Sequence, residues 1–282
     1  MARVWNHVTV IGCGLIGGSF ALALKRSGAV ARISGWDVSA RSLDEALACG
    51  AIDDVDDSFA GEKISPADLI YLAMPVDEII RFFHERGSLV KTGAIVTDAG
   101  STKAEICRAA REYLPAGRHF VGGHPIAGSH RAGISHARAE LFNDAPYVLM
   151  RDNEQSDGDA LSAVEELIKQ TGARVELMTA EEHDRAMAFV SHLPQLMSNA
   201  LAAAVTGQSN ADELERLSGN GYRDMTRLAE SSWSIWRDIL LTNDANIAAA
   251  LDLFIEKLVS VRDELRERDE GSELKDTHAL FR

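Results

Sequence analysis

Short apolar runs alternate with amphipathic helical segments along the first two thirds of the chain. Runs rich in β-branched and apolar residues predict strands over 7–12, 31–37, 68–75, 94–100, 119–125 and 145–150. Helical spacing is found over 19–28, 42–50 and 76–86, and the first two of these segments end in glycine. Thr102 and Glu105 have the spacing of a capping box for the helix after the fourth strand. This alternation, to about residue 177, predicts a mostly parallel sheet with helices on both faces.

The pattern changes near residue 178. No convincing strand follows Thr179, and segments 181–205 and 246–268 are long, rich in alanine and leucine, and helical in period. We therefore expect two domains, an α/β domain over residues 1–177 and an all-helical domain over residues 178–282.

Composition narrows the class of protein. The 282 residues carry a formal net charge of −14, whereas a general nucleic-acid binder is normally basic. No apolar stretch approaches the roughly 20 residues of a membrane span, and the N-terminus lacks signal-peptide features. The three cysteines show neither CxxC pairing nor zinc spacing. We expect a cytoplasmic protein with no metal site and no nucleic-acid or membrane partner.

The segment GCGLIG, residues 12–17, has the order of a dinucleotide-binding turn between a strand and a helix. Its first glycine permits a tight turn, its second lets the backbone approach a pyrophosphate, and its third lets helix and strand pack closely. The acid Asp37 ends the second strand and suits the ribose hydroxyls of NAD, although Arg41 nearby leaves NADP open. A glycine turn in some other α/β protein is the alternative. The expected cofactor-binding residues are Gly12, Gly14, Leu15, Ile16, Gly17 and Asp37.

A histidine, His124, lies in the glycine-rich segment GGHPIAGSHRAG over residues 122–133. An imidazole titrates near physiological pH and can take a proton from a hydroxyl as hydride leaves the same carbon. Ser101, in DAGSTK, follows the neighbouring strand and can orient the imidazole or the substrate. The alternatives are an ordinary surface or core histidine for His124 and a helix-capping serine for Ser101.

Together these segments resemble the prephenate/arogenate (cyclohexadienyl) dehydrogenase family. The resemblance covers nearly the whole chain and rests on GCGLIGGS, DAGSTK, GHPIAGSHRAG, SHLPQ and GYRDMTRLAESSWSIWRD. It implies a Rossmann-type nucleotide-binding domain followed by an all-α domain that forms a homodimer. It also implies that a cyclohexadienyl substrate is oxidised by NAD and decarboxylated to 4-hydroxyphenylpyruvate or tyrosine.

The resemblance also implies roles for individual residues. His124 matches the catalytic histidine, Ser101 the serine close to it, and Arg227 the arginine that binds the ring carboxylate. A guanidinium can grip a carboxylate with two parallel hydrogen bonds, which a lysine cannot do. Other expected pocket residues are Arg223, Trp236 and His192, whereas His183 is expected to be a structural residue at a helix start. The alternatives are a solvated helix-face arginine for Arg227 and an ordinary core residue for Trp236.

Two positions depart from the family pattern. Gln195 stands where many prephenate-using bacterial members have a histidine, and we expect it to bind substrate. A neutral amide favours the doubly anionic prephenate less than a histidine does. The glutamine therefore shifts the expectation toward the use of arogenate, or of both substrates. His130 stands where some members have an acid, so a gating role for that position does not carry over.

Two other classes remain as alternatives. Another NAD-linked dehydrogenase of the hydroxyacid and imine superfamily typically needs a lysine base on the first helix of its second domain, but EEHDRAMAFVSHLPQ contains no lysine. A non-catalytic NAD-binding protein has no reason to carry His124, Ser101 and Arg227 together.

Overall fold

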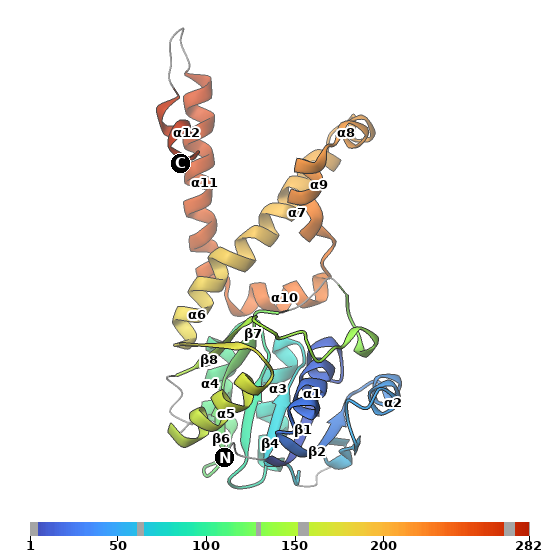
Figure 1. The fold of residues 1–282 in the computed structure, drawn as a ribbon. Helices are drawn as coiled ribbons and strands as arrows, with labels where there is room; N and C mark the ends of the chain where they lie inside the picture. Colours follow the sequence, from blue (N-terminus) through green and yellow to red (C-terminus); the bar gives the residue numbers. More distant parts are fainter. Residues whose placement is uncertain (1–4, 61–64, 128–130, 152–157, 268–273, 282) are drawn as a thin grey trace. The chain divides into compact units, whose positions relative to one another are not determined.

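The computed structural model describes residues 5–60, 65–127, 131–151, 158–267 and 274–281 (Figure 1). The chain forms two compact units. The first comprises Met1–Asp184 and Trp233–Thr242, and the second comprises Arg185–Ser232 and Asn243–Arg282.

A six-stranded parallel sheet is the centre of the first unit, in the order β3-β2-β1-β4-β5-β6. The strands are β1 (Trp5–Ile11), β2 (Val30–Trp36), β3 (Asp54–Val55), β4 (Leu69–Leu72), β5 (Ile95–Asp98) and β6 (His119–Val121). The prediction of a parallel sheet is confirmed. The strand order reverses between β1 and β4, and ligands of such sheets bind beyond the carboxyl ends of the strands at this point.

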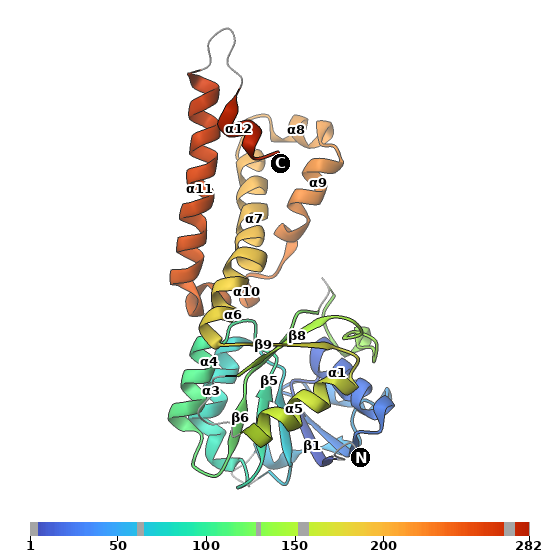
Figure 2. The same cartoon turned by 60° about the vertical axis from the view of Figure 1, so that its left-hand side comes forward.

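Helices cover both faces of this sheet, as expected (Figure 2). One face packs against α1 (Leu15–Ser27), α2 (Ala40–Ala48) and α5 (Gly158–Gln170), and the other against α3 (Val76–Arg86) and α4 (Ala104–Tyr113). In β4, Leu69 and Tyr71 belong to the first apolar cluster, whereas Ile70 and Leu72 belong to the second. Because successive strand residues point to opposite faces, a strand buried on both sides is apolar throughout.

A second sheet holds β7 (Gly123–Pro125), β8 (Pro146–Met150) and β9 (Arg174–Met178). The single strand predicted over 119–125 is wrong, because the chain leaves the first sheet after β6 and enters the second at β7. Gly122 lies at this transition, where an added Cβ would stand 2.8 Å from Met150 Cγ. The bulk around Gly122 therefore favours glycine there.

The buried carboxylate of Asp98 joins the two sheets. It accepts hydrogen bonds from the backbone N–H of Gly100, at 2.8 Å, and of Gly123, at 2.9 Å. It also forms an ion pair with the Lys103 ammonium, and both side chains are completely buried. The end of β5, the start of β7 and the N-terminus of α4 are thus held by one charged group.

The predicted capping box of α4 is wrong. The Thr102 hydroxyl is hydrogen-bonded to that of Thr242, at 2.8 Å, and Glu105 is paired with Arg108. Instead, Asp184 accepts from the backbone N–H of Lys103 at 2.7 Å and of Ala104 at 2.8 Å. A carboxylate supplied from a distant helix satisfies two N–H groups that the first turn leaves without intrahelical partners.

Helix α10 (Trp233–Thr242) belongs to the first unit, although it lies far along the chain. The predicted domains are two consecutive segments that meet at residues 177–178. The first compact unit instead runs on to Asp184 and also includes the separate segment α10. Asp238 of α10 is buried beside Asp77 of α3, and burial together with the Asp77 carboxyl group raises the pKa of Asp238.

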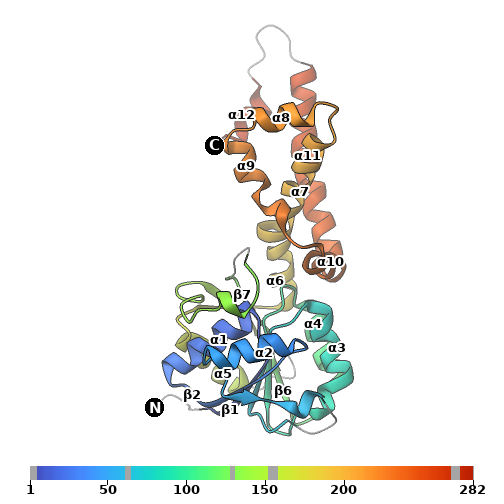
Figure 3. The same ribbon diagram turned by 90° about the vertical axis from the view of Figure 1, so that its right-hand side faces the viewer.

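The second unit is helical, and no strand follows Met178 in the described part of the chain. Its elements are a π-helical turn (Ala188–His192), α7 (Leu193–Thr206), α8 (Ala211–Leu217), α9 (Asn220–Thr226), a 3₁₀ turn (Arg227–Glu230), α11 (Asp244–Arg266) and α12 (Lys275–Ala279). Helix α7 packs against α9 and α11 (Figure 3). The boundary along the chain between Asp184 of the first unit and Arg185 of the second falls within helix α6 (Ala180–Met187). None of the described helices has the length and apolar character needed to cross a membrane.

The buried ion pair has a testable energetic role. Replacing Lys103 with Met leaves the buried Asp98 charge without its ammonium partner, and we expect a loss of about 3–5 kcal/mol in the free energy of unfolding. The control is Lys25→Met, because Lys25 pairs with Asp53 at 2.6 Å where both side chains are partly exposed. That variant is expected to lose less than about 1 kcal/mol. Urea unfolding measures both, and equal losses would contradict the role assigned to Lys103.

Candidate active site

The glycine turn between β1 and α1 has the geometry its sequence predicts. Gly12 has φ +92°, and a Cβ there would lie 2.2 Å from the Ala73 carbonyl oxygen. A Cβ on Gly17 would lie 2.0 Å from the Gly12 carbonyl oxygen, whereas a Cβ on Gly14 would meet nothing within 4 Å. The first and third glycines are therefore required by packing. The second faces open space that a ligand can approach, and Leu15 and Ile16 follow it in the first turn of α1.

A cavity of about 640 Å³ opens beside this turn. Its lining includes Gly12, Gly14, Trp36, Asp37, Phe59 and Arg86. A cavity of this size, with mostly apolar walls and a few polar groups, is typical of small-molecule and cofactor sites. The glycine turn, the acid and the apolar walls together fit one half of a dinucleotide.

Asp37 is fixed by the backbone. One of its carboxylate oxygens accepts from Cys13 N–H and the other from Ser39 N–H, each at 2.8 Å. A carboxylate oxygen can accept more than one hydrogen bond, so Asp37 can also serve a ribose. Arg41 is paired with Glu45 at 2.7 Å and does not line the cavity. Burial, with the Asp37 charge nearby, raises the pKa of Cys13 to about 12, so Cys13 is a neutral thiol.

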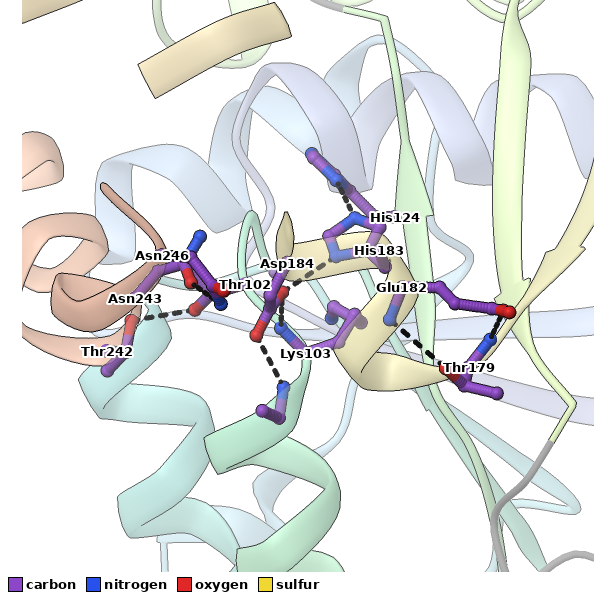
Figure 4. Close-up of polar contacts among 12 residues, drawn as sticks. Thr102, Lys103, His124, Thr179, Glu182, His183, Asp184, Thr242, Asn243 and Asn246 are labelled. Carbon is purple, nitrogen blue, oxygen red and sulfur yellow. Dashed lines mark hydrogen bonds and ion pairs between the residues drawn. The ribbon is translucent and has the colours of Figure 1, made fainter. Parts of the chain in front are cut away.

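His124 lies half-buried on β7, and its ring contacts a second histidine (Figure 4). His124 Nδ1 and His183 Nε2 are 2.8 Å apart, and His183 Nδ1 lies 2.8 Å from Asp184 Oδ1. His183 does occupy the first turn of α6, but it is completely buried and its ring is bonded to the candidate base. Local sequence does not reveal this contact, because the two histidines are 59 positions apart.

Two further candidates, Ser101 and Trp236, belong to the first unit. Ser101 is half-buried between the Asp98 loop and α4, and its catalytic role stays a prediction. Trp236 is half-buried on α10. Gly128 and His130 lie outside the described residues. In the part of the chain that the structure describes, no three or more His, Cys, Asp or Glu side chains are grouped to hold a metal ion.

In the second unit, Gln195 is bound to the turn that carries Arg227. Its side-chain Nε2 donates to Leu228 O at 2.6 Å and to Asn199 Oδ1 at 2.7 Å, and its Oε1 accepts from Ser231 Oγ at 3.2 Å. Gln195 is 4% exposed. Both ends of its amide thus hold protein groups. Gln195 anchors the turn at whose start the Arg227 side chain is exposed.

Two other candidates lie near this turn or on the helix that leads into α7. Arg223 is exposed on α9, one helical turn before Arg227. His192 is buried and its Nδ1 lies 3.2 Å from Asn243 Nδ2. His192 ends the π-helical turn, and Pro194 follows it within the first turn of α7. Since proline lacks an N–H and its ring displaces the carbonyl four residues earlier, it accounts for the wider turn before α7.

Comparison with known proteins gives a consistent result. Residues 20–177 match the family model described as prephenate dehydrogenase, nucleotide-binding domain, and residues 179–278 match the model of its dimerization domain. The chain belongs to the prephenate dehydrogenase family. This confirms the resemblance found in the sequence.

Individual relatives agree along almost the full chain. A prephenate dehydrogenase of Bacillus subtilis is 35% identical over 95% of this chain and 72% of its own. A cyclohexadienyl dehydrogenase of Zymomonas mobilis is 32% identical over 94% of this chain and 90% of its own. The structure of A. aeolicus prephenate dehydrogenase with hydroxyphenyl propionate and NAD+ has a TM-score of 0.91 and 29% identity, covering 100% and 98% of the two chains.

The glycine geometry separates two variants that look alike in sequence. Gly12→Ala places a Cβ against Ala73 at a positive φ, so we expect it to lower the free energy of unfolding by more than about 1 kcal/mol. Gly14→Ala adds its methyl group in open space, so its stability should stay within about 0.5 kcal/mol of the parent while NAD binding weakens. Urea unfolding and NAD titration by fluorescence test the pair. Unchanged NAD affinity in Gly14→Ala would contradict the role given to Gly14.

Proposed function

We propose that this protein catalyses the NAD-dependent oxidative decarboxylation of prephenate, arogenate or both. The products are 4-hydroxyphenylpyruvate or tyrosine, with CO2 and NADH. One observation carries the proposal. His124 is hydrogen-bonded to His183, and both lie in the same compact unit as a glycine turn of the dinucleotide-binding type. The names of the relatives support the reaction, since they are prephenate and cyclohexadienyl dehydrogenases.

The residues around the glycine turn fit NAD. The Gly12–Gly17 turn and the first N–H groups of α1 would hold the pyrophosphate, and Asp37 would accept hydrogen bonds from a ribose. An acid at this position repels a 2′-phosphate, which favours NAD over NADP. NAD, when bound, supplies the hydride acceptor.

His124 acts as the base in this proposal. It accepts the proton of the ring hydroxyl while the carbon bearing that hydroxyl gives up hydride and becomes a carbonyl carbon. The ring then loses its carboxylate as CO2 and becomes a phenolate, and aromaticity makes the step effectively irreversible. Ser101 orients the hydroxyl or the imidazole. His124 holds the hydroxyl proton during this step and then returns it to the phenolate oxygen, which gives the phenol product.

Residues of the second unit and of α10 supply the remaining groups in this proposal. Arg227 binds the ring carboxylate through two parallel hydrogen bonds, and Arg223, Trp236 and His192 are further substrate-binding residues, as their places in the family motifs imply. We further propose a homodimer formed through the second unit. Its longest helix, α11, supports this because Leu253, Ile255 and Leu258 are each about half exposed.

We propose a cytoplasmic location on the same compositional grounds as above. The three cysteines of the chain, Cys13, Cys49 and Cys107, are free thiols, which fits a reducing compartment.

The proposal is tested by NADH formation. Purified protein with NAD should produce NADH, read at its absorbance band, from prephenate, from arogenate or from both, with lower kcat/KM when NADP replaces NAD. The ratio of the two kcat/KM values gives the preferred substrate. Protein that binds NAD but turns over neither substrate would refute the proposed function.

The base and the carboxylate-binding arginine are separable by kinetics. His124→Asn is expected to lower kcat by about 10²–10⁴-fold with little change in KM, because a positioned general base contributes that much. Normal turnover in this variant would refute the assignment of the base.

Arg227→Ala is expected to raise KM about 10- to 150-fold, the equivalent of the about 1.5–3 kcal/mol of a charged hydrogen bond. Arg216→Ala is the control, since Arg216 lies in the last turn of α8 and has no assigned role. An unchanged KM in Arg227→Ala would remove Arg227 from the pocket.

A further inference from the structure

Three side chains form a hydrogen-bonded row that runs from the N-terminus of α4 to the candidate base. We call His124, His183 and Asp184 the histidine row. Its two internal contacts, His124 Nδ1 to His183 Nε2 and His183 Nδ1 to Asp184 Oδ1, are each 2.8 Å long (Figure 4). His183 and Asp184 have almost no solvent exposure, whereas His124 is half-buried. The row is therefore buried at one end and accessible at the other.

The direction of each bond follows from Asp184. Its two oxygens accept the backbone N–H groups of Lys103 and Ala104, at 2.7 and 2.8 Å. An ionised carboxylate only accepts hydrogen bonds, so His183 Nδ1 must carry the proton and donate it. A neutral His183 then has its lone pair on Nε2, and that nitrogen must accept from the Nδ1–H of His124.

The charges around His183 agree with a neutral ring. Burial is the largest effect and lowers the pKa of His183, and the nearby Lys103 ammonium lowers it further, while Asp184 and Asp98 act in the opposite direction. Lys103 and Asp98 are paired with each other, so Asp184 supplies the uncompensated charge next to the ring. One carboxylate bonded to Nδ1 selects the Nδ1–H tautomer of His183.

We infer that His183 and Asp184 are positioning residues that hold neutral His124 in the Nδ1–H tautomer, so that Nε2 is the nitrogen which takes the proton of the substrate hydroxyl. The inference rests on the proposed function. In the step, the O–H bond of the substrate breaks and an N–H bond forms at His124 Nε2, which holds the proton until the phenolate oxygen of the product takes it back. No proton passes along the row, and Asp184 stays ionised and stabilises the imidazolium that His124 becomes.

Hydrogen bonds to the backbone hold the histidine row in place. Asp184 cannot turn away without releasing two N–H groups of α4, and Gly123, the residue before His124, is held by Asp98 through its own N–H. The imidazole is thus restrained both through its ring and through its backbone.

The tautomer itself can be measured without activity. Imidazole ¹⁵N shifts of the histidine-labelled full-length protein, with the His124 signals assigned by loss in His124→Asn, distinguish a protonated nitrogen from one with a lone pair. Above the pH at which His124 is neutral, we expect the proton on Nδ1. A proton on Nε2, or a mixture of both forms, would overturn the inference whether or not the protein turns over prephenate or arogenate.

Variants of His183 connect the tautomer to catalysis. His183→Leu removes the acceptor for Nδ1–H, so the His124 signals should move toward the Nε2–H form. Its kcat should fall by at least about tenfold, but by no more than the about 10²–10⁴-fold that a general base contributes, with KM nearly unchanged. His183→Gln keeps an amide oxygen that can accept from Nδ1–H, and it should recover part of both the ¹⁵N signature and kcat.

A matched control separates this effect from a general loss of stability. His7 is also a buried histidine of the first unit, and its ring is hydrogen-bonded to Ser34 at 2.7 Å. His7→Gln should leave the His124 tautomer and kcat unchanged even where it lowers stability. The inference is overturned if His183→Leu keeps full kcat, or if His7→Gln loses as much kcat as His183→Leu.

Discussion

The buried charge of Asp98 is the constraint around which the first unit is arranged. A carboxylate without solvent contact must be paired and hydrogen-bonded, because desolvating an unpaired charge costs several kcal/mol. Asp98 meets this requirement with Lys103 and with the N–H groups of Gly100 and Gly123. As these partners come from the loop after β5, from α4 and from β7, none of the three can shift without exposing or unpairing the charge.

A second buried carboxylate, Asp184, acts at the other side of the N-terminus of α4. It replaces a local cap with one from a residue 81 positions away, and its remaining bond orients His183. The two carboxylates therefore restrain His124 from two directions, one through the backbone of Gly123 and one through the imidazole ring. His124 is hydrogen-bonded on its buried side and half exposed on the other, so in its proposed role as the base it can meet a substrate without losing its orientation.

In the second unit, one buried side chain, Gln195, holds the turn that begins at Arg227. In the proposed role of Arg227, a turn that is already held in place lowers the conformational entropy lost when a carboxylate binds. Gln195 contributes by holding Leu228 and Ser231, the residues that follow Arg227 in its turn. Both N–H groups of the Gln195 amide are already donated within the protein, and its role in binding substrate stays a prediction.

The amino-acid sequence by itself determined most of the local conformations and the family. The apolar runs specified the buried strands. The glycines of residues 12–17 specified a turn in which a Cβ on Gly12 or Gly17 would collide with a backbone carbonyl oxygen. Only the tertiary structure decided the partners of the polar groups. Thr102 and Glu105 have the spacing of a cap, yet Asp184 caps α4. His183 is a helix-start residue by its position, yet its ring contacts His124. The tertiary structure likewise decided that residues 119–125 divide between two sheets and that α10 packs with the first unit. The physical reason is range: backbone preference depends on a few neighbouring residues, whereas a hydrogen bond depends on which distant segments the sheet and its helices bring within 3 Å.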